Sequence, residues 1–212
     1  MTVLPAKWSA FLDQQHRYPS GCIGQFIGER MRRQHAPETN WSVDQLHLQP
    51  TDRVLEIGFG AGRGLALAMA QADQRRVIGV DLSPTMLRAA ARHHRMALAR
   101  GQLILVQGNL TNLPFAEACF DKLFSIHTFY FWPDPRAVCM QLIGMLARGG
   151  RLVSTFATAR KRPNGEWQFW EVHQVAEALV NALDAYANIT ATLLYGPDSR
   201  AYNNVAIVID KA

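Results

Sequence analysis

Short runs of apolar and β-branched residues alternate along most of the chain with longer segments whose apolar residues recur at helical spacing. The short runs lack the polar alternation of a half-exposed strand. Strands of this kind, separated by helices, are typical of a parallel sheet that is covered on both faces. The pattern predicts an α/β fold on a doubly wound, mostly parallel sheet, with strands at residues 53–57, 76–80, 102–107, 122–126 and 151–156.

Helices are predicted between and after these strands, at residues 65–71, 84–100, 135–146 and 166–186. Pro84 follows Ser83, and proline is favourable in the first turn of a helix. The tail differs, because its strands at 189–195 and 204–209 are joined only by a turn-rich segment. A connection this short cannot hold a helical crossover, and it therefore predicts an antiparallel C-terminal hairpin.

The beginning of the chain lies outside this alternation. Residues 6–48 are predicted to be helical, with breaks at residues 18–21 and 36–37. We expect them to cover the sheet. The predicted organisation is a helical N-terminal cap or lid at residues 1–48, followed by one α/β domain at residues 49–212.

Composition agrees with a globular chain, because the 212 residues are 49% hydrophobic and 18% charged. No apolar stretch approaches the roughly 18 residues that a membrane span requires, and residues 1–12 contain no apolar run of a signal peptide. An odd number of widely spaced cysteines describes neither a disulfide framework nor a zinc site: Cys22, Cys119 and Cys139. We expect a soluble, cytoplasmic protein without a metal site or a membrane span.

The formal net charge of +5 raises the question of a nucleic-acid partner, and its distribution matters more than its total. Residues 84–100 contain no acid, and Arg88, Arg92 and Arg95 recur there at helical spacing, which favours a solvated helix face. A second basic cluster, residues 160–162, is expected at the ligand-binding edge after the fifth strand. This cluster either attracts an anionic substrate or forms a solvated rim.

The first predicted strand ends in a glycine-rich turn, Gly58-x-Gly60-x-Gly62, and a helix follows. Glycines let the backbone turn sharply and approach a ligand closely. In an open α/β sheet this turn is where a nucleotide-like ligand binds, although such a turn can also be purely structural. A nicotinamide dinucleotide site expects Gly-x-Gly-x-x-Gly, and the third glycine position is Arg63 or Leu65 in the two registers. The dinucleotide pattern therefore fails.

With Glu56 the turn reads Glu-x-Gly-x-Gly-x-Gly, which resembles motif I of the class I S-adenosylmethionine-dependent methyltransferases. The resemblance covers roughly residues 39–212. Asn109 and Arg148 depart from the Asp and Pro that this family usually has there. Further segments resemble the family in the same order, namely the second strand ending at Asp81 and residues 108–110, 120–125 and 146–152.

This resemblance implies a Rossmann-like fold, S-adenosylmethionine as the cofactor, and the small-molecule subgroup that includes the ubiquinone and menaquinone pathway enzymes. It implies that Glu56 and the glycines line the methionine and ribose side, that Asp81 accepts the ribose hydroxyls, and that Asn109 lies at the adenine. Glu56 could instead pair with an arginine, Asp81 could cap the next helix, and Met86 could be plain core. The expected cofactor-binding residues are Glu56, Gly58, Gly60, Gly62, Asp81, Leu82, Met86, Gly108, Asn109, Leu110 and Ile126.

The segment 125–135 follows the fourth strand and holds one histidine among four aromatic residues. His127 is the candidate general base or acceptor-orienting group, which is needed only if the acceptor must lose a proton; a structural role is the alternative. The aromatics suit an apolar or planar substrate, or a cation-π wall, and they could also be ordinary packing. In related small-molecule methyltransferases the N-terminal helical region closes over the acceptor. The expected substrate-binding residues are Tyr18, His35, Trp41, Tyr130 and Trp132, with Phe26 as a further lid candidate.

Several features argue against nucleic acid as the substrate. The motif of amino-group base methyltransferases is absent at the fourth strand, where Ile126-His127-Thr128 stands, and no cysteine nucleophile occupies that strand end. No RNA-binding module is appended. We therefore expect a small-molecule methyl acceptor, and we keep an RNA methyltransferase and a non-catalytic cofactor-binding protein as alternatives. The acceptor atom and the oligomeric state are left open.

Overall fold

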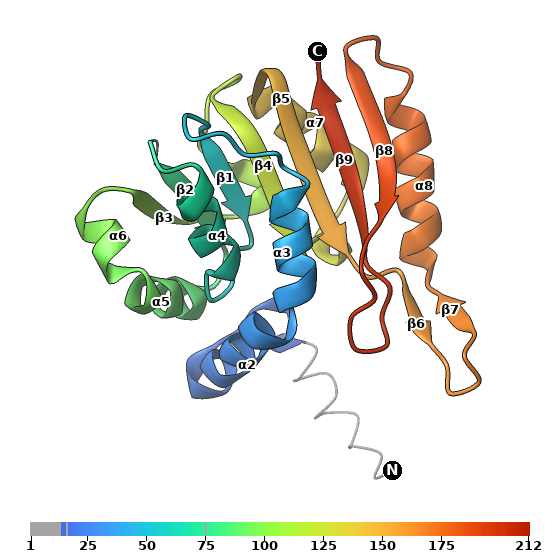
Figure 1. Ribbon diagram of the computed structural model, residues 1–212, viewed down its shortest axis with the longest axis horizontal. Helices are drawn as coiled ribbons and strands as arrows, with labels where there is room; N and C mark the ends of the chain where they lie inside the picture. The colour runs from blue at the N-terminus through green and yellow to red at the C-terminus, as the bar shows by residue number, and fades with distance from the viewer. Residues whose placement is uncertain (1–13, 16, 75) are drawn as a thin grey trace.

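The computed structural model describes residues 14–15, 17–74 and 76–212, and its centre is a seven-stranded sheet (Figure 1). The strands of this sheet are β1 (Val54–Ile57), β2 (Val77–Asp81), β3 (Leu103–Gln107), β4 (Phe120–Ile126), β5 (Leu146–Phe156), β8 (Ile189–Tyr195) and β9 (Val205–Lys211). Their order is β3-β2-β1-β4-β5-β9-β8. The strands β1 to β5 pair in parallel, and β9 is antiparallel to both β5 and β8. The predicted Rossmann-like sheet with an antiparallel C-terminal hairpin is confirmed.

Helices connect the parallel strands and lie on both sides of the sheet (Figure 1). The α-helices are α2 (Gly21–Gln34), α3 (Ala36–Asp44), α4 (Arg63–Gln71), α5 (Pro84–His93), α6 (Arg95–Ala99), α7 (Pro135–Met145) and α8 (Glu171–Leu183). Two short 3-10 helices follow strand ends, η1 (Leu110–Asn112) and η2 (Phe129–Phe131). Among the described residues, no helix has the length and apolar character that crossing a membrane requires.

Successive residues of the central strands point to opposite faces of the sheet and join two separate apolar cores. Leu55 and Leu123 pack on one face with side chains of α7 and α8. Val54 and Phe124 pack on the other face with side chains of α3 and α4. Both faces are therefore buried, which explains why these strands lack polar alternation in the sequence.

The N-terminal helices lie against the sheet at the end where β1 finishes (Figure 1). α3 packs against α4, β4 and β5, and α2 packs against α5. The break between α2 and α3 falls at His35, one residue before the predicted break. Residues 1–13 and 16 of the predicted cap lie outside the described residues. Because α3 shares a core with the sheet, the division into a cap and a domain stays a prediction.

Two predicted helices are shorter in the structure. The helix predicted at 84–100 is interrupted at His94, whose φ is −114° and whose Nε2 lies 2.8 Å from the carbonyl oxygen of Gly62. The helix predicted at 166–186 begins only with α8, because the preceding residues form a second, two-stranded sheet. In that sheet β6 (Ala159–Lys161) pairs antiparallel with β7 (Trp167–Phe169).

Candidate functional site

A cavity of about 520 Å³ opens at the carboxyl ends of β1, β2 and β4 and extends under α2. Parallel strands bring these ends to one edge of the sheet, so that loops far apart in the sequence meet there. Four loops and the N-terminal region form the wall. The wall includes residues 56–61 at the end of β1 and after it, residues 80–82 at the end of β2 and after it, residues 108–111 after β3, residues 126–128 and 130–133 at the end of β4 and after it, and residues of α2 and α3.

The glycine turn after β1 has left-handed backbone at each of its three glycines, with φ values of +70°, +54° and +84°. A Cβ on Gly58 would collide with Cγ2 of Thr128, so only glycine fits there. Gly60 faces open space and donates its N–H to Oδ2 of Asp81 at 2.8 Å. Gly62 is not among the residues that line the cavity and packs against His94, so its contact with the cofactor stays a prediction.

Two buried carboxyl groups stand behind this turn. Asp81 accepts the N–H of Gly60 and, through Oδ1, the N–H of Ser83, while Ser83 itself caps α5. Burial raises the pKa of Asp81 to about 6, against the effect of these two hydrogen bonds. Burial also raises the pKa of Glu56 well above its usual range, and the charge of Asp81 adds to this effect. Among the described residues Oε2 of Glu56 has no hydrogen-bond partner.

The wall near β2 and β3 is mostly apolar. Met86 is 2% exposed, lines the cavity and packs against Gly28 of α2, so it is both core and cavity wall. Leu82 is 46% exposed and also faces the cavity. Oδ1 of Asn109 accepts the N–H of Thr111 at 3.2 Å and thereby caps η1. The remaining predicted members of this wall, Gly108, Leu110 and Ile126, line the cavity as well.

The end of the cavity away from β2 and β3 is formed by the segment after β4. His127 has a left-handed φ of +56°, which is rare for a residue other than glycine and occurs at functional sites. Tyr130 and Trp132 line the cavity, whereas Phe129 turns away and stacks on Phe156 in the core. The guanidinium of Arg17 lies 5.8 Å from the ring centroid of Phe131 at the same end. This end therefore combines aromatic rings with a histidine and a cation.

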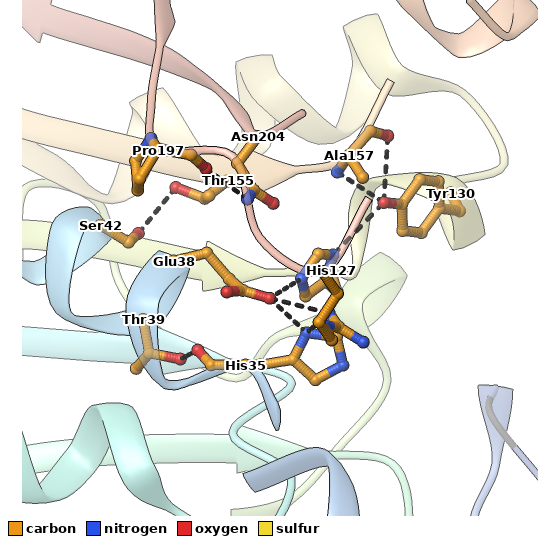
Figure 2. A network of polar contacts seen from close by, with 11 residues as sticks. His35, Glu38, Thr39, Ser42, His127, Tyr130, Thr155, Ala157, Pro197 and Asn204 are labelled. Atoms are coloured by element: carbon orange, nitrogen blue, oxygen red, sulfur yellow. Dashed lines mark hydrogen bonds and ion pairs between the residues drawn. The ribbon is translucent and has the colours of Figure 1, made fainter. Parts of the chain in front are cut away.

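A network of polar contacts surrounds His127 (Figure 2). Its centre is Glu38 on α3, a side chain with no solvent exposure. Oε1 of Glu38 lies 2.7 Å from Nδ1 of His35, 3.0 Å from Nη2 of Arg200 and 3.3 Å from Nε2 of His127. Burial opposes ionisation of Glu38, but the hydrogen bonds from His127 and His35 outweigh it and hold its pKa well below the usual range. Burial lowers the pKa of His127, and Glu38 acts in the opposite direction.

The structure separates the predicted substrate-binding residues into two groups. His35, Tyr130 and Trp132 lie on the cavity wall. Tyr18 and Trp41 do not, and a role of these two residues in substrate binding stays a prediction. The ring of Trp41 fills the space beside Gly196. The further lid candidate, Phe26, is 69% exposed and does not reach the wall either.

Sequence reasoning missed several charged residues of the site. Glu38 lies three positions after His35, a helical spacing that could have linked the two. Arg63 lines the cavity, donates through Nη2 to Oδ1 of Asn40, and has a buried Nε without a partner among the described residues. Arg200 left no sequence signal, because it reaches Glu38 across 162 positions of the chain.

The basic cluster at residues 160–162 begins in β6, just after β5 as predicted, but it is exposed and does not line the cavity. The guanidinium of Arg160 lies over Tyr202, and the ammonium of Lys161 lies over Trp167. These positions favour the solvated rim over a role in holding a bound substrate.

Comparison with known proteins agrees with this arrangement. Residues 55–154 match the family model described as "Methyltransferase domain". The uncharacterized methyltransferase YdaC of Bacillus subtilis (strain 168) is 29% identical over 115 residues, which are 54% of this chain and 61% of that protein. The malonyl-[acyl-carrier protein] O-methyltransferase of Herminiimonas arsenicoxydans is 34% identical over 123 residues, which are 58% of this chain and 44% of that protein. The matched part is therefore less than two thirds of the length of either relative.

A solved structure extends the similarity to most of the fold. The crystal structure of a SAM dependent methyltransferase from Aquifex aeolicus superposes with a TM-score of 0.66 at 15% identity, over 89% of this chain and 98% of that one. The family match covers the glycine turn, both carboxyl groups behind it and the segment after β4. Residues 55–154 of this chain therefore match a methyltransferase domain, the fold around them is that of a SAM dependent methyltransferase, and the cofactor that this similarity supports is S-adenosylmethionine.

Proposed function

We propose that this protein transfers the methyl group of S-adenosylmethionine to a small-molecule acceptor bound beside His127. The observation that carries the proposal is the shape of the cavity. One continuous wall joins the glycine turn and Asp81 to the aromatic segment that holds His127 and Tyr130. A cofactor and a second molecule can therefore meet inside it.

The residues around the glycine turn suit the cofactor. The carboxylate of Asp81 can accept the two ribose hydroxyls, and the unpartnered Oε2 of Glu56 suits a donor group of the cofactor. Met86 and Leu82 offer apolar surface for the adenine, beside the carbonyl and amide groups of Asn109. The buried and unpartnered Nε of Arg63 suits a carboxylate. When bound, S-adenosylmethionine supplies an electrophilic methyl group, and the electron pair of the broken C–S bond stays on the departing thioether.

The chain contributes alignment, exclusion of water and, for an acceptor that must lose a proton, a base. Positioning inside a low-dielectric pocket can supply much of the acceleration of such a displacement. His127 is the residue we assign to the proton, because it lies on the cavity wall and burial keeps its pKa below the usual value. The aromatic rings of Tyr130 and Trp132 favour an apolar or planar acceptor. The relative from Herminiimonas arsenicoxydans is named as an O-methyltransferase, which makes an oxygen acceptor the first choice here.

The test is a transfer assay with purified protein. Incubation with S-adenosylmethionine and a panel of quinols, phenols, carboxylic acids and amines should release S-adenosylhomocysteine with at least one member of the panel. Saturable cofactor binding without release, across the whole panel, would support the non-catalytic alternative. Methylation of mixed RNA that weakens steeply with added salt would support the RNA alternative.

A further inference from the structure

We propose that Glu38 is a positioning residue, which fixes the tautomer and the charge of His127 so that His127 takes the acceptor's proton through the hydroxyl of Tyr130. The inference rests on the proposed methyl transfer and deepens it. Glu38 lies on α3, outside the matched methyltransferase domain, and it reaches the segment after β4 across 89 positions of the chain. Figure 2 shows the three side chains side by side in space, with His127 between Glu38 and Tyr130.

The direction of the first hydrogen bond follows from the charge of Glu38. A carboxylate without a proton can only accept, so Nε2 of His127, 3.3 Å from Oε1, must carry the hydrogen of this pair. In a neutral imidazole the other nitrogen, Nδ1, is then a hydrogen-bond acceptor. Glu38 thus selects one of the two tautomers of His127 and leaves Nδ1 free to receive a proton.

The partner of Nδ1 is the hydroxyl of Tyr130, at 3.3 Å. The oxygen of this hydroxyl accepts the backbone N–H of Ala157 at 2.7 Å. Its own hydrogen can go to the carbonyl oxygen of Ala157, at 3.1 Å, or to Nδ1 of His127. Because Tyr130 lines the cavity, its hydroxyl is the point where a proton from a bound acceptor enters the chain of hydrogen bonds.

In the proposed step the acceptor loses one proton to the side chains of the cavity wall. The X–H bond of the acceptor breaks, and its electron pair forms the bond to the methyl carbon. The acceptor's proton passes to the oxygen of Tyr130, which gives its own hydrogen to Nδ1 of His127. The imidazolium that results is stabilised by the negative charge of Glu38 on its other side. Tyr130 is neutral before and after this exchange, which agrees with burial raising its pKa.

Two further groups face the same carboxylate and oppose its effect on His127. Nη2 of Arg200 lies 3.0 Å from Oε1 of Glu38 and 3.0 Å from Nδ1 of His35. The ring centroids of His35 and His127 are 4.3 Å apart. The charge of Glu38 favours the imidazolium form of His127, whereas the charges of Arg200 and His35 disfavour it. Removal of Glu38 should therefore lower the pKa of His127, and removal of Arg200 should raise it.

Nitrogen-15 NMR of the imidazole rings tests this arrangement without any acceptor. Wild-type protein should show His127 as the Nε2–H tautomer. In Glu38→Gln the pKa of His127 should fall, and in Arg200→Gln it should rise by a smaller amount, because Arg200 has the weaker influence. An Nδ1–H tautomer in the wild type, or shifts of the same sign in both variants, would overturn the proposal.

Kinetics with an acceptor that is turned over give the second readout. Glu38→Gln and Tyr130→Phe should each lower kcat about 10²-fold, with S-adenosylhomocysteine affinity within about twofold of wild type. The acidic limb of the pH profile should move to lower pH in Glu38→Gln and to higher pH in Arg200→Gln. Glu38→Asp, which keeps the charge, should recover part of the rate. The matched control is Glu177→Gln, because Glu177 pairs with His173 on α8, away from the cavity, at 3.4 Å.

The outcomes separate this inference from the proposed function. Wild-type protein that binds no cofactor, or transfers no methyl group, contradicts the proposed function, while the NMR result still decides how Glu38 acts on His127. Normal transfer by Glu38→Gln with an unchanged pH profile contradicts the inference alone. If Glu38→Gln does not fold, Arg200→Gln decides the inference. Arg200 lies in the loop before β9 with its side chain 36% exposed, so its replacement should leave the fold intact. An unshifted or lowered pKa of His127 in that variant overturns the inference.

Discussion

At the scale of single residues, the carboxylate of Asp81 has two roles that both depend on its charge. Its carboxylate holds the glycine turn through the N–H of Gly60, and the same group is the proposed acceptor of the ribose hydroxyls. Burial raises its pKa to about 6, so the cofactor-free protein takes up a proton there in mildly acidic solution. Hydroxyl donors form stronger hydrogen bonds with the charged form of Asp81 than with the protonated form. Cofactor binding should therefore depend on pH through this one side chain.

We predict that the dissociation constant of S-adenosylhomocysteine is constant above pH 6 and rises toward tenfold per pH unit below it. The sign follows because the folded protein without cofactor binds a proton at Asp81 below pH 6, and the complex must release it. Calorimetric titrations between pH 5 and pH 8 measure the slope. Asp81→Ala should flatten it and weaken binding by about 1.5–3 kcal/mol. The control is Asp73→Ala at an exposed position, and a slope that survives in Asp81→Ala would rule out the assignment.

At the scale of elements, the glycine turn is held in place by its neighbour after β4. Gly58 has φ +70°, and a Cβ there would meet Thr128. We predict that Gly58→Ala lowers the free energy of unfolding by about 1–3 kcal/mol, through backbone strain and this collision, and weakens cofactor binding. Urea unfolding and calorimetry measure the two effects.

The chain offers a matched pair of controls for that substitution. Gly144 in α7 has open space around its Cβ position, and its φ is not positive, so Gly144→Ala should leave the stability unchanged or raise it by up to about 1 kcal/mol. Thr128→Ser removes the methyl group that the added Cβ of Gly58→Ala would strike, so the double variant should regain part of the loss. Equal losses in Gly58→Ala and Gly144→Ala would contradict the close fit at Gly58.

Elements were predictable where local pattern determines them. The strand at 189–195 was predicted with its observed bounds, because its two ends are marked by turn residues. β6 and β7 were missed although Asn164-Gly165 between them is a local hairpin signal, because the residues from 166 onward were assigned to the following helix. The helix expected over 84–100 is interrupted at His94, whose side chain contacts the carbonyl oxygen of Gly62 far away in the sequence.

In the candidate site, residues of local motifs were predicted, and residues brought together only by the fold were missed. The turn glycines, Asp81 and Asn109 belong to motifs with local spacing, and most of them line the cavity as expected. The network around His127 is assembled from α3, the segment after β4 and the loop before β9. Sequence position identified His127 and His35 but not Glu38, whose importance comes from contacts made only in the fold.

At the scale of the whole molecule, binding of the cofactor should be visible as thermal stability. A ligand that binds only the folded state stabilises it by about 2.7 kcal/mol at a concentration 100 times its Kd. For a chain of this size that corresponds to a rise in Tm of about 5–10 °C. S-adenosylhomocysteine should produce this rise, and NADH should not, because the turn lacks the dinucleotide spacing. A thermal shift assay with both compounds checks the prediction, and equal shifts would contradict the cofactor assignment.

The position of β9 between β5 and β8 has a consequence for how such proteins diverge. It places the loop that carries Arg200 beside α3, so the contacts around His127 come largely from segments that flank the matched domain, residues 55–154. The groups proposed to hold the cofactor lie within that domain. Substitutions in α3 or in the loop before β9 should therefore alter which acceptor is bound and leave the proposed cofactor-binding groups unchanged.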